Sequence, residues 1–160
     1  MSRTETEHNG FVIEGDEKFI EQTGAALDLL EKKSHTGYQL AKDFIGRIKK
    51  TDKRSGMGNF ENPPTFYVNE LTAHAGLEWY ASCIVHDANH AREHREYVRK
   101  HPVLGPMLRF AQNFFHIGWQ EAEKRCLETQ YSTLLDLGER SLADYVRSLD
   151  GTHFRNRGIW

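Results

Sequence analysis

The chain has 160 residues, of which 38% are apolar and 28% are charged, and its formal net charge is −2. This composition is typical of a soluble globular protein, and the length is sufficient for one domain with a buried core. The near-neutral charge argues against a basic surface for nucleic acid, and no apolar run approaches the roughly 20 residues that cross a bilayer. The polar start and the two cysteines, both in predicted helices, indicate neither a signal peptide nor a disulfide framework. We therefore expect synthesis in the cytoplasm and no binding to nucleic acid or membrane.

The first part of the chain predicts a strand and a helix after a disordered lead-in over residues 1–10. Residues 11–13 are short and apolar, as in a strand. Asp16 is a typical N-cap for a helix over Glu17–Lys33, in which apolar residues recur at helical spacing and lysines close the last turn. One folded domain is expected over residues 11–160.

The next segments predict a short helix, two strands and a long loop. Residues 36–37 are expected to break the first helix before a second one over residues 38–45. Arg47–Lys50 either continues that helix or forms an edge strand, and we favour the strand. Residues 51–64 contain glycines and prolines with little apolar content and predict a loop, whereas residues 66–68 predict a strand.

Residues 76–97 predict the longest helix, around which the rest of the chain is organised. Its first half is apolar, its second half is charged, and Pro102 must end it. His86, Asp87 and His90 lie at the change-over. Because residues four apart lie above one another on a helix, the two imidazoles can meet at one point. This is the H-E-x-x-H arrangement with aspartate in place of glutamate, and it predicts a zinc site.

Three further helices are expected downstream. The first begins at Pro106, and the second covers Trp119–Leu137 and ends at Gly138. The third covers residues 141–149, begins with a Ser-x-x-Asp capping box and precedes a basic, aromatic tail.

A catalytic zinc ion normally has three protein ligands and one open position, so the histidine pair needs a third ligand. The helix over Trp119–Leu137 follows a chain reversal and should pack antiparallel to the histidine helix. Glu123 lies on its apolar face and is the predicted third ligand, whereas Glu121 points elsewhere and is the alternative. The other side chains on or beside this face are Cys126, Leu127, Gln130 and Leu134.

Asp87 is the predicted general base, which would take a proton from the attacking water and pass it to the leaving group. Because aspartate is one methylene shorter than glutamate, its reach is shorter by roughly 1.5 Å. This difference leaves catalysis an open question even if zinc binds. The further side chains expected to support the site or to contact substrate are His74, His94, Cys126, Gln130 and His153.

The segments IVHDANH, EKRCLETQ, LDLG and SLDGTH resemble the zincin-like metallopeptidase domains of bacterial polymorphic toxins and effectors, one group of which carries a His, Asp/Asn and Cys signature. The resemblance implies a mostly helical α+β, zincin-like fold in which a small sheet packs on the metal-binding helix. It also implies cleavage of a protein or peptide substrate, a cognate immunity protein and delivery to a target cell by a specialised secretion system. The implied site residues are His86, His90 and Glu123 as zinc ligands, Asp87 as the acid and Cys126 as the signature cysteine.

Two other functions remain open from the sequence. Adjacent His and Asp on a helix also mark HD-type metal-dependent phosphohydrolases, for which His74 and either Asp136 or Asp144 would have to supply the remaining ligands. Alternatively, the chain is a catalytically degenerate module that binds zinc and a partner, which the aspartate in place of glutamate permits. Metal content, phosphodiesterase assays and protease assays separate the three hypotheses.

Overall fold

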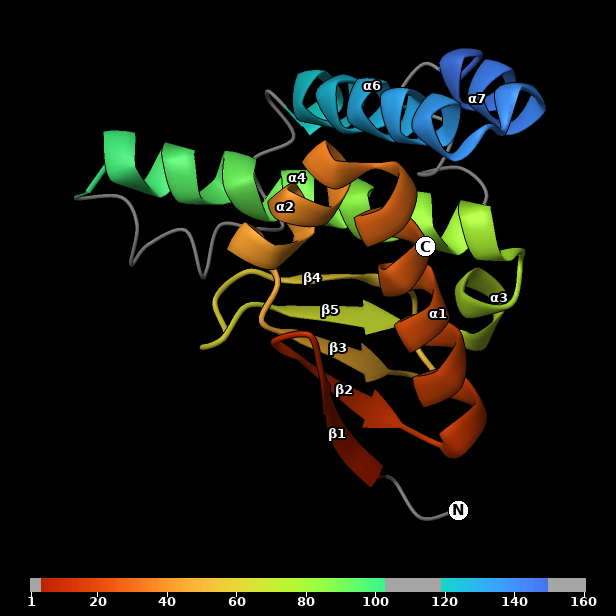
Figure 1. The fold of residues 1–160 in the computed structure, drawn as a ribbon. Coiled ribbons are helices and arrows are strands. Elements are labelled where there is room, and N and C mark those ends of the chain that lie inside the picture. The colour runs from red at the N-terminus through yellow and green to blue at the C-terminus, as the bar shows by residue number, and fades with distance from the viewer. Residues whose placement is uncertain (1–3, 103–118, 150–160) are drawn as a thin grey trace.

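The computed structural model describes residues 4–102 and 119–149, which form an α+β fold with more helix than strand (Figure 1). The strands are β1 (Thr4–His8), β2 (Phe11–Gly15), β3 (Arg47–Lys50), β4 (Gly56–Gly58) and β5 (Thr65–Val68). The helices in these ranges are α1 (Glu17–Lys33), α2 (His35–Phe44), α3 (Glu70–Ala73), α4 (Leu77–Lys100), α6 (Trp119–Leu137) and α7 (Arg140–Arg147). The predicted class, mostly helical α+β with a small sheet, is confirmed, and none of the described helices is long and apolar enough to cross a membrane.

The sheet is mixed and has the strand order β1-β2-β3-β5-β4. The three inner strands β2, β3 and β5 are parallel, and the two edge strands β1 and β4 pair antiparallel with their neighbours. Parallel neighbours need a long crossover, and α1 with α2 supplies the one between β2 and β3. The helices that Figure 1 labels all lie on one side of the sheet.

Helix α4 occupies the middle of the molecule, between the sheet and α6 (Figure 1). A helix that is covered on several sides is apolar around most of its circumference, which explains the apolar first half of α4. The main core joins the inner strands to α1, α2 and α4. Its largest buried side chains include Phe11, Ile13, Leu27, Leu30, Ile48, Phe66, Tyr80 and Ile84.

Most predicted elements have the expected type and place. The Asp16 carboxylate accepts a hydrogen bond from the Phe19 amide at 3.0 Å, so it caps α1 as predicted. Arg47–Lys50 is a strand as favoured, but β3 pairs with β2 and β5 inside the sheet, so the expected edge position is wrong. The central helix ends before Pro102. Gly138 has a φ of +89° just after α6, in the backbone region that L side chains rarely adopt, which confirms it as the stop.

The disordered lead-in predicted for residues 1–10 is wrong for the described part of that range. β1 (Thr4–His8) pairs with β2 through a tight turn at Asn9 and Gly10, whose φ values are +50° and +89°. Asn-Gly is the preferred sequence for a two-residue hairpin turn with two positive φ angles. The hairpin therefore forms although β1 itself is polar.

Three other boundaries differ from the sequence predictions. α1 ends at Lys33 with Ser34 as its C-cap, and residues 36–37 lie inside α2 instead of breaking a helix. The loop predicted for residues 51–64 contains the short edge strand β4. α7 begins after Glu139 without a side-chain cap, so the capping box expected at residues 141–144 does not start this helix. The helix expected from Pro106, the tail and His153 lie outside the described residues.

Candidate metal centre

α4 and α6 pack antiparallel, as the chain reversal between them predicts. Gln130 donates to Ser82 at 3.1 Å, and farther along the pair Asn89 donates to the Cys126 sulfur at 3.2 Å. Rising numbers on α6 therefore meet falling numbers on α4. This arrangement places the start of α6 opposite the histidines of α4.

Three side chains with metal-ligand atoms converge where the two helices face each other, and they form a triangle of His86, His90 and Glu123. The Nε2 atoms of His86 and His90 lie 3.1 Å apart. The two carboxylate oxygens of Glu123 reach one histidine each, with Oε1 at 3.3 Å from His86 Nε2 and Oε2 at 3.0 Å from His90 Nε2. The i, i+4 spacing on α4 fixes the histidine pair, and the packing of α6 supplies the carboxylate.

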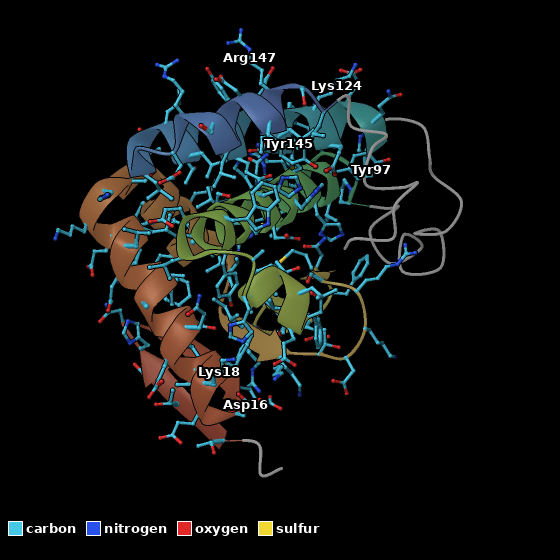
Figure 2. All side chains as sticks on the ribbon, turned by 90° about the vertical axis from the view of Figure 1, so that its right-hand side faces the viewer. Asp16, Lys18, Tyr97, Lys124, Tyr145 and Arg147 are labelled. Carbon is cyan, nitrogen blue, oxygen red and sulfur yellow. The ribbon has the colours of Figure 1, made fainter. Side chains whose placement is uncertain are left out.

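Burial differs strongly around this triangle. The side chains of His86 and Glu123 are each 2% exposed, whereas that of His90 is 22% exposed. Access from solvent is therefore on the His90 side, toward the second half of α4. The alternative ligand Glu121 is 66% exposed and pairs at 3.0 Å with Lys124, which Figure 2 shows on the outer surface. Glu121 is thus excluded from the triangle.

Cys126 adds a fourth donor near the histidines. Its sulfur and the nearest nitrogens of His86 and His90 all lie within 4.8 Å of one another, and the thiol is buried. This group of His86, His90 and Cys126 could hold a metal ion. Two donor sets share the histidines, one completed by the Glu123 carboxylate and the other by the Cys126 sulfur.

The spacing of the donors fits a small tetrahedral ion. Zinc binds nitrogen and oxygen ligands at roughly 2.0–2.2 Å, and tetrahedral ligands at that radius lie about 3.3 Å from one another. The two imidazole nitrogens lie 3.1 Å apart, and each lies 3.3 or 3.0 Å from a different oxygen of the Glu123 carboxylate, so all three contacts are close to this value. The donor chemistry of imidazole, carboxylate and thiolate is that of zinc sites, and these residues therefore fit zinc.

The electrostatics of the triangle favour a charged carboxylate. Burial alone would raise the pKa of Glu123, but hydrogen bonds from His86 and His90 outweigh burial and lower it to about 2. Burial likewise opposes the charged form of His90, while hydrogen bonds with Cys126 and Glu123 raise its pKa well above its ordinary value. The anionic Glu123 carboxylate thus faces both imidazoles in a largely buried position, and it can offset the charge of a bound cation once His90 has released its proton.

Asp87 lies beside the triangle with a different protonation balance. It is buried, and within the described residues its Oδ2 atom has no hydrogen-bond partner. Burial raises the pKa of Asp87 to about 6, although the neighbouring His86 and His90 act in the opposite direction. A buried carboxyl group that titrates near neutrality and has a free oxygen is suited to exchanging a proton.

Comparison with protein-family models, curated proteins and solved structures gives no match. The zincin-like fold expected from the sequence segments therefore remains a prediction.

Gln130 and His94, which the sequence predicts as supporting or substrate-contacting residues, lie near the metal centre on different helices. Gln130 lies on the inner face of α6, one turn beyond Cys126, and donates to Ser82 and, at 3.7 Å, to the Cys83 sulfur. His94 lies one turn beyond His90 on the solvent-accessible side and makes an edge contact with Phe60, with ring centroids 4.7 Å apart.

His74 does not lie in the metal centre. It follows α3 and contributes to the low pKa of Asp16, after the larger effects of the Lys50 hydrogen bond and the Phe19 amide. It is therefore near Asp16 at the start of α1, and Figure 2 shows Asp16 on the opposite side of the fold from α6. His74 thus does not complete the histidine pair, and its contact with substrate stays a prediction.

The sequence interpretation missed Asn89. Its side chain is fully buried and donates to Cys126, which orients the sulfur toward the histidines. The signal was present, since residue 89 is three positions after His86 and so lies on the α4 face that meets α6. Asn89 was missed because nothing in the sequence alone paired it with Cys126.

Proposed function

We propose that this chain is a zinc-dependent hydrolase of the metallopeptidase type, which cleaves a peptide bond. The observation that carries the proposal is the triangle of His86, His90 and Glu123, which matches zinc ligand spacing and is accessible on the His90 side. Catalytic zinc sites have three protein ligands and one open position, and two histidines with a glutamate are one of their common ligand sets. Zinc in this site would polarise a substrate carbonyl and lower the pKa of water.

Asp87 has the role of general base in this proposal. Its Oδ2 atom would accept a proton from the attacking water and hold it until the leaving amine takes it up. Support comes from its place next to His86, from the unsatisfied oxygen and from the pKa of about 6. The shorter side chain of aspartate limits the reach of this oxygen, so the predicted rate is lower than with glutamate.

The decisive experiment measures metal and activity in the same preparations. The purified protein, loaded with zinc and dialysed, should hold about one zinc ion per chain, and His90→Ala should hold much less. The zinc-loaded protein should cleave members of a mixed peptide library, as detected by mass spectrometry, and a chelator should stop cleavage. Zinc retention without any cleavage would contradict the hydrolase proposal, and no zinc retention would contradict the metal centre.

Cys126 supports a second candidate function, a zinc-binding interaction module without catalysis. If its sulfur completes the coordination, the ion has four protein ligands, as in structural sites. Replacing zinc by cobalt tests this directly, because thiolate ligation gives an intense sulfur-to-cobalt charge-transfer absorption. If the chain is an interaction module, the cobalt-loaded wild type should show this absorption. Cys126→Ala should lose the absorption and most of the bound metal. The hydrolase requires that Cys126→Ala keeps both metal and cleavage.

The HD-type phosphohydrolase gains no support from the described residues. His74 is near the start of α1, Asp136 accepts a hydrogen bond from Ser34 at 2.6 Å, and Asp144 is exposed on α7. None of these three side chains reaches the histidine pair. Phosphodiesterase activity that depends on His86 would reverse this preference.

The wider role in the proposal is that of a bacterial toxin or effector domain, opposed by a cognate immunity protein and delivered by a secretion system. This part rests on the resemblance of the short sequence segments. Expression in a bacterial cytoplasm tests it. The wild-type chain should slow growth, and Asp87→Asn, at equal expression, should not. Equal growth of both strains would argue against toxicity in that host.

A further inference from the structure

A cavity of about 350 Å³ lies between the second half of α4 and the segment that joins β4 to β5. Its volume falls within the range of roughly 300–1,000 Å³ that is usual for ligand sites. α4 contributes His94, Arg95 and Val98, α2 contributes Phe44, and the joining segment contributes Asn59 and Glu61. The walls are therefore partly apolar, with a few polar groups among them.

Two residues that line this cavity have a buried polar atom without a hydrogen-bond partner in the described chain. These atoms are Oδ1 of Asn59 and Nε2 of His94. Buried polar atoms are nearly always hydrogen-bonded, and each exception calls for a missing partner. The amide oxygen accepts a hydrogen bond, and the imidazole nitrogen accepts or donates one according to its tautomer. Phe60 packs edge-on against the His94 ring and holds it in place.

The charged groups of the cavity already have partners. Glu61 accepts a hydrogen bond from the Tyr67 hydroxyl at 2.6 Å. The Arg95 guanidinium lies over the Phe44 ring, 5.1 Å from its centroid. Burial lowers the pKa of His94, which favours its neutral form. The unsatisfied groups are thus neutral, and a neutral ligand matches them better than an ion does.

The cavity is close to the accessible side of the metal centre. His94 is one helical turn beyond His90, and one turn of helix advances about 5.4 Å along its axis. An extended peptide advances roughly 3.3 Å per residue, so this distance corresponds to one or two residues of substrate. His90, which is more exposed than His86 and Glu123, lies on this same half of α4.

We infer that this cavity binds a tyrosine side chain of the substrate, one or two residues from the bond that is cut. The apolar walls accommodate the ring, and the phenol hydroxyl, which both donates and accepts, satisfies Asn59 Oδ1 or His94 Nε2. The role in substrate selection rests on the proposed hydrolase function. The binding of a phenol in the cavity does not depend on it.

The test is an NMR titration that needs neither zinc nor cleavage. N-acetyl-tyrosinamide and N-acetyl-phenylalaninamide, which differ by the hydroxyl, are added to isotope-labelled protein in the presence of a chelator. The tyrosine amide should give saturable shifts at residues 59–62 and 91–98, with about tenfold higher affinity than the phenylalanine amide. His94→Phe or Asn59→Ala should remove this preference, and His35→Phe, on the exposed face of α2, should keep it.

Equal affinity for the two amides would overturn the inference, as would shifts outside these residues or a preference that survives both cavity variants. Circular dichroism and zinc content of each variant show whether the fold and the metal centre persist. If the protein binds tyrosine amide but retains no zinc after loading and dialysis without chelator, the proposed function is overturned and the cavity assignment stands. If zinc-dependent cleavage occurs but tyrosine is not enriched within two residues of the cut bonds, the proposed function stands. The role of the cavity in substrate selection is then overturned.

Discussion

Glu123 Oε2 on α6 lies 3.0 Å from His90 Nε2 on α4, in a contact that joins the two helices at the His90 side of the metal centre. The same carboxylate reaches His86 with its other oxygen at 3.3 Å. A buried carboxylate that bridges two imidazoles is anionic at neutral pH because those hydrogen bonds lower its pKa to about 2. One residue of α6 thereby converts a pair of neighbouring histidines into a three-donor site.

Glu123→Ala should weaken zinc binding by more than the 10-fold to 100-fold loss that removal of outer supporting groups causes. The reason is that it removes a donor atom and the carboxylate that both imidazoles face. Competition with a chromophoric chelator measures the affinity. Glu121→Ala is the matched control, since its side chain is exposed and pairs with Lys124, and it should bind zinc as the wild type does. Equal affinities in the two variants would show that Glu123 is not a ligand.

Asp87→Asn should keep about one zinc ion per chain and lose peptide cleavage by roughly 10²-fold to 10⁴-fold, the usual contribution of a general base. Asparagine has nearly the same shape but cannot take up the proton at this position. Asp87→Glu should raise the rate because it restores the reach that the glutamate of an H-E-x-x-H site has. Steady-state cleavage of the same peptide by the three proteins measures both effects. Undiminished cleavage by Asp87→Asn would remove Asp87 from the mechanism.

The features of the site that could be predicted from the sequence are those set by residue spacing within one helix. Helical periodicity placed the two histidines together, and the apolar face of α6 separated Glu123 from Glu121, because both patterns depend only on spacing along one helix. The position of Asn89 opposite Cys126 depends on how the two helices pack, and spacing along one helix does not reveal it. The removal of His74 from the site has the same cause, since the path of the chain around α3 is set by tertiary contacts.

The fold follows the same division. β2 and β5 were predictable from their short apolar runs, whereas β1 is polar and is held by its pairing with β2 and by the Asn9–Gly10 turn. That turn signal is present in the sequence, and giving it weight over the polar composition would have predicted the hairpin. β4 contains two glycines in three residues, and it forms because β5 offers it an edge to pair with.

Ion pairs of Glu14 on the outer face of the sheet should make the free energy of unfolding decrease at acid pH. Hydrogen bonds from Lys49, opposed by burial and assisted by Arg47, lower the pKa of Glu14 below its ordinary value of 4.5. A carboxyl group with a lowered folded-state pKa stabilises the protein above about pH 4.5, and this contribution disappears as the pH falls through the lowered pKa. Glu14→Gln should therefore lower the thermal midpoint at pH 7 and flatten its decline below pH 4.5.

The expected loss for Glu14→Gln at pH 7 is within about 1 kcal/mol, the range of ion pairs near the surface. Glu21→Gln, at an exposed position of α1, is the control and should leave the pH profile unchanged. Thermal unfolding followed by circular dichroism between pH 3 and pH 7 measures both variants. Parallel profiles for Glu14→Gln and the wild type would show that the pair with Lys49 contributes nothing to acid sensitivity.

Gly37 belongs to a segment that suggests a helix break in the sequence but lies inside α2. It lies in α2 where that helix meets α4 and α6. A Cβ atom there would be 2.9 Å from Ser34 Oγ and 3.1 Å from Val85 Cγ2. The Ser34 hydroxyl cannot easily move, because it donates to Asp136 at 2.6 Å. Glycine is thus present for close packing, although alanine is ordinarily the better helix former.

Gly37→Ala should therefore destabilise the protein, by about 1–3 kcal/mol, as overpacking of a core does. Gly24 in α1 is the matched control, since it is also a buried helical glycine, but a Cβ atom there would only touch the His8 ring at an ordinary 3.4 Å. Gly24→Ala should stabilise by about 0.5–1 kcal/mol through helix propensity. Urea unfolding of the two variants measures the difference in sign. Stabilisation by both substitutions would mean that α2 has room to move away from α4, and that the contact with Val85 does not constrain residue 37.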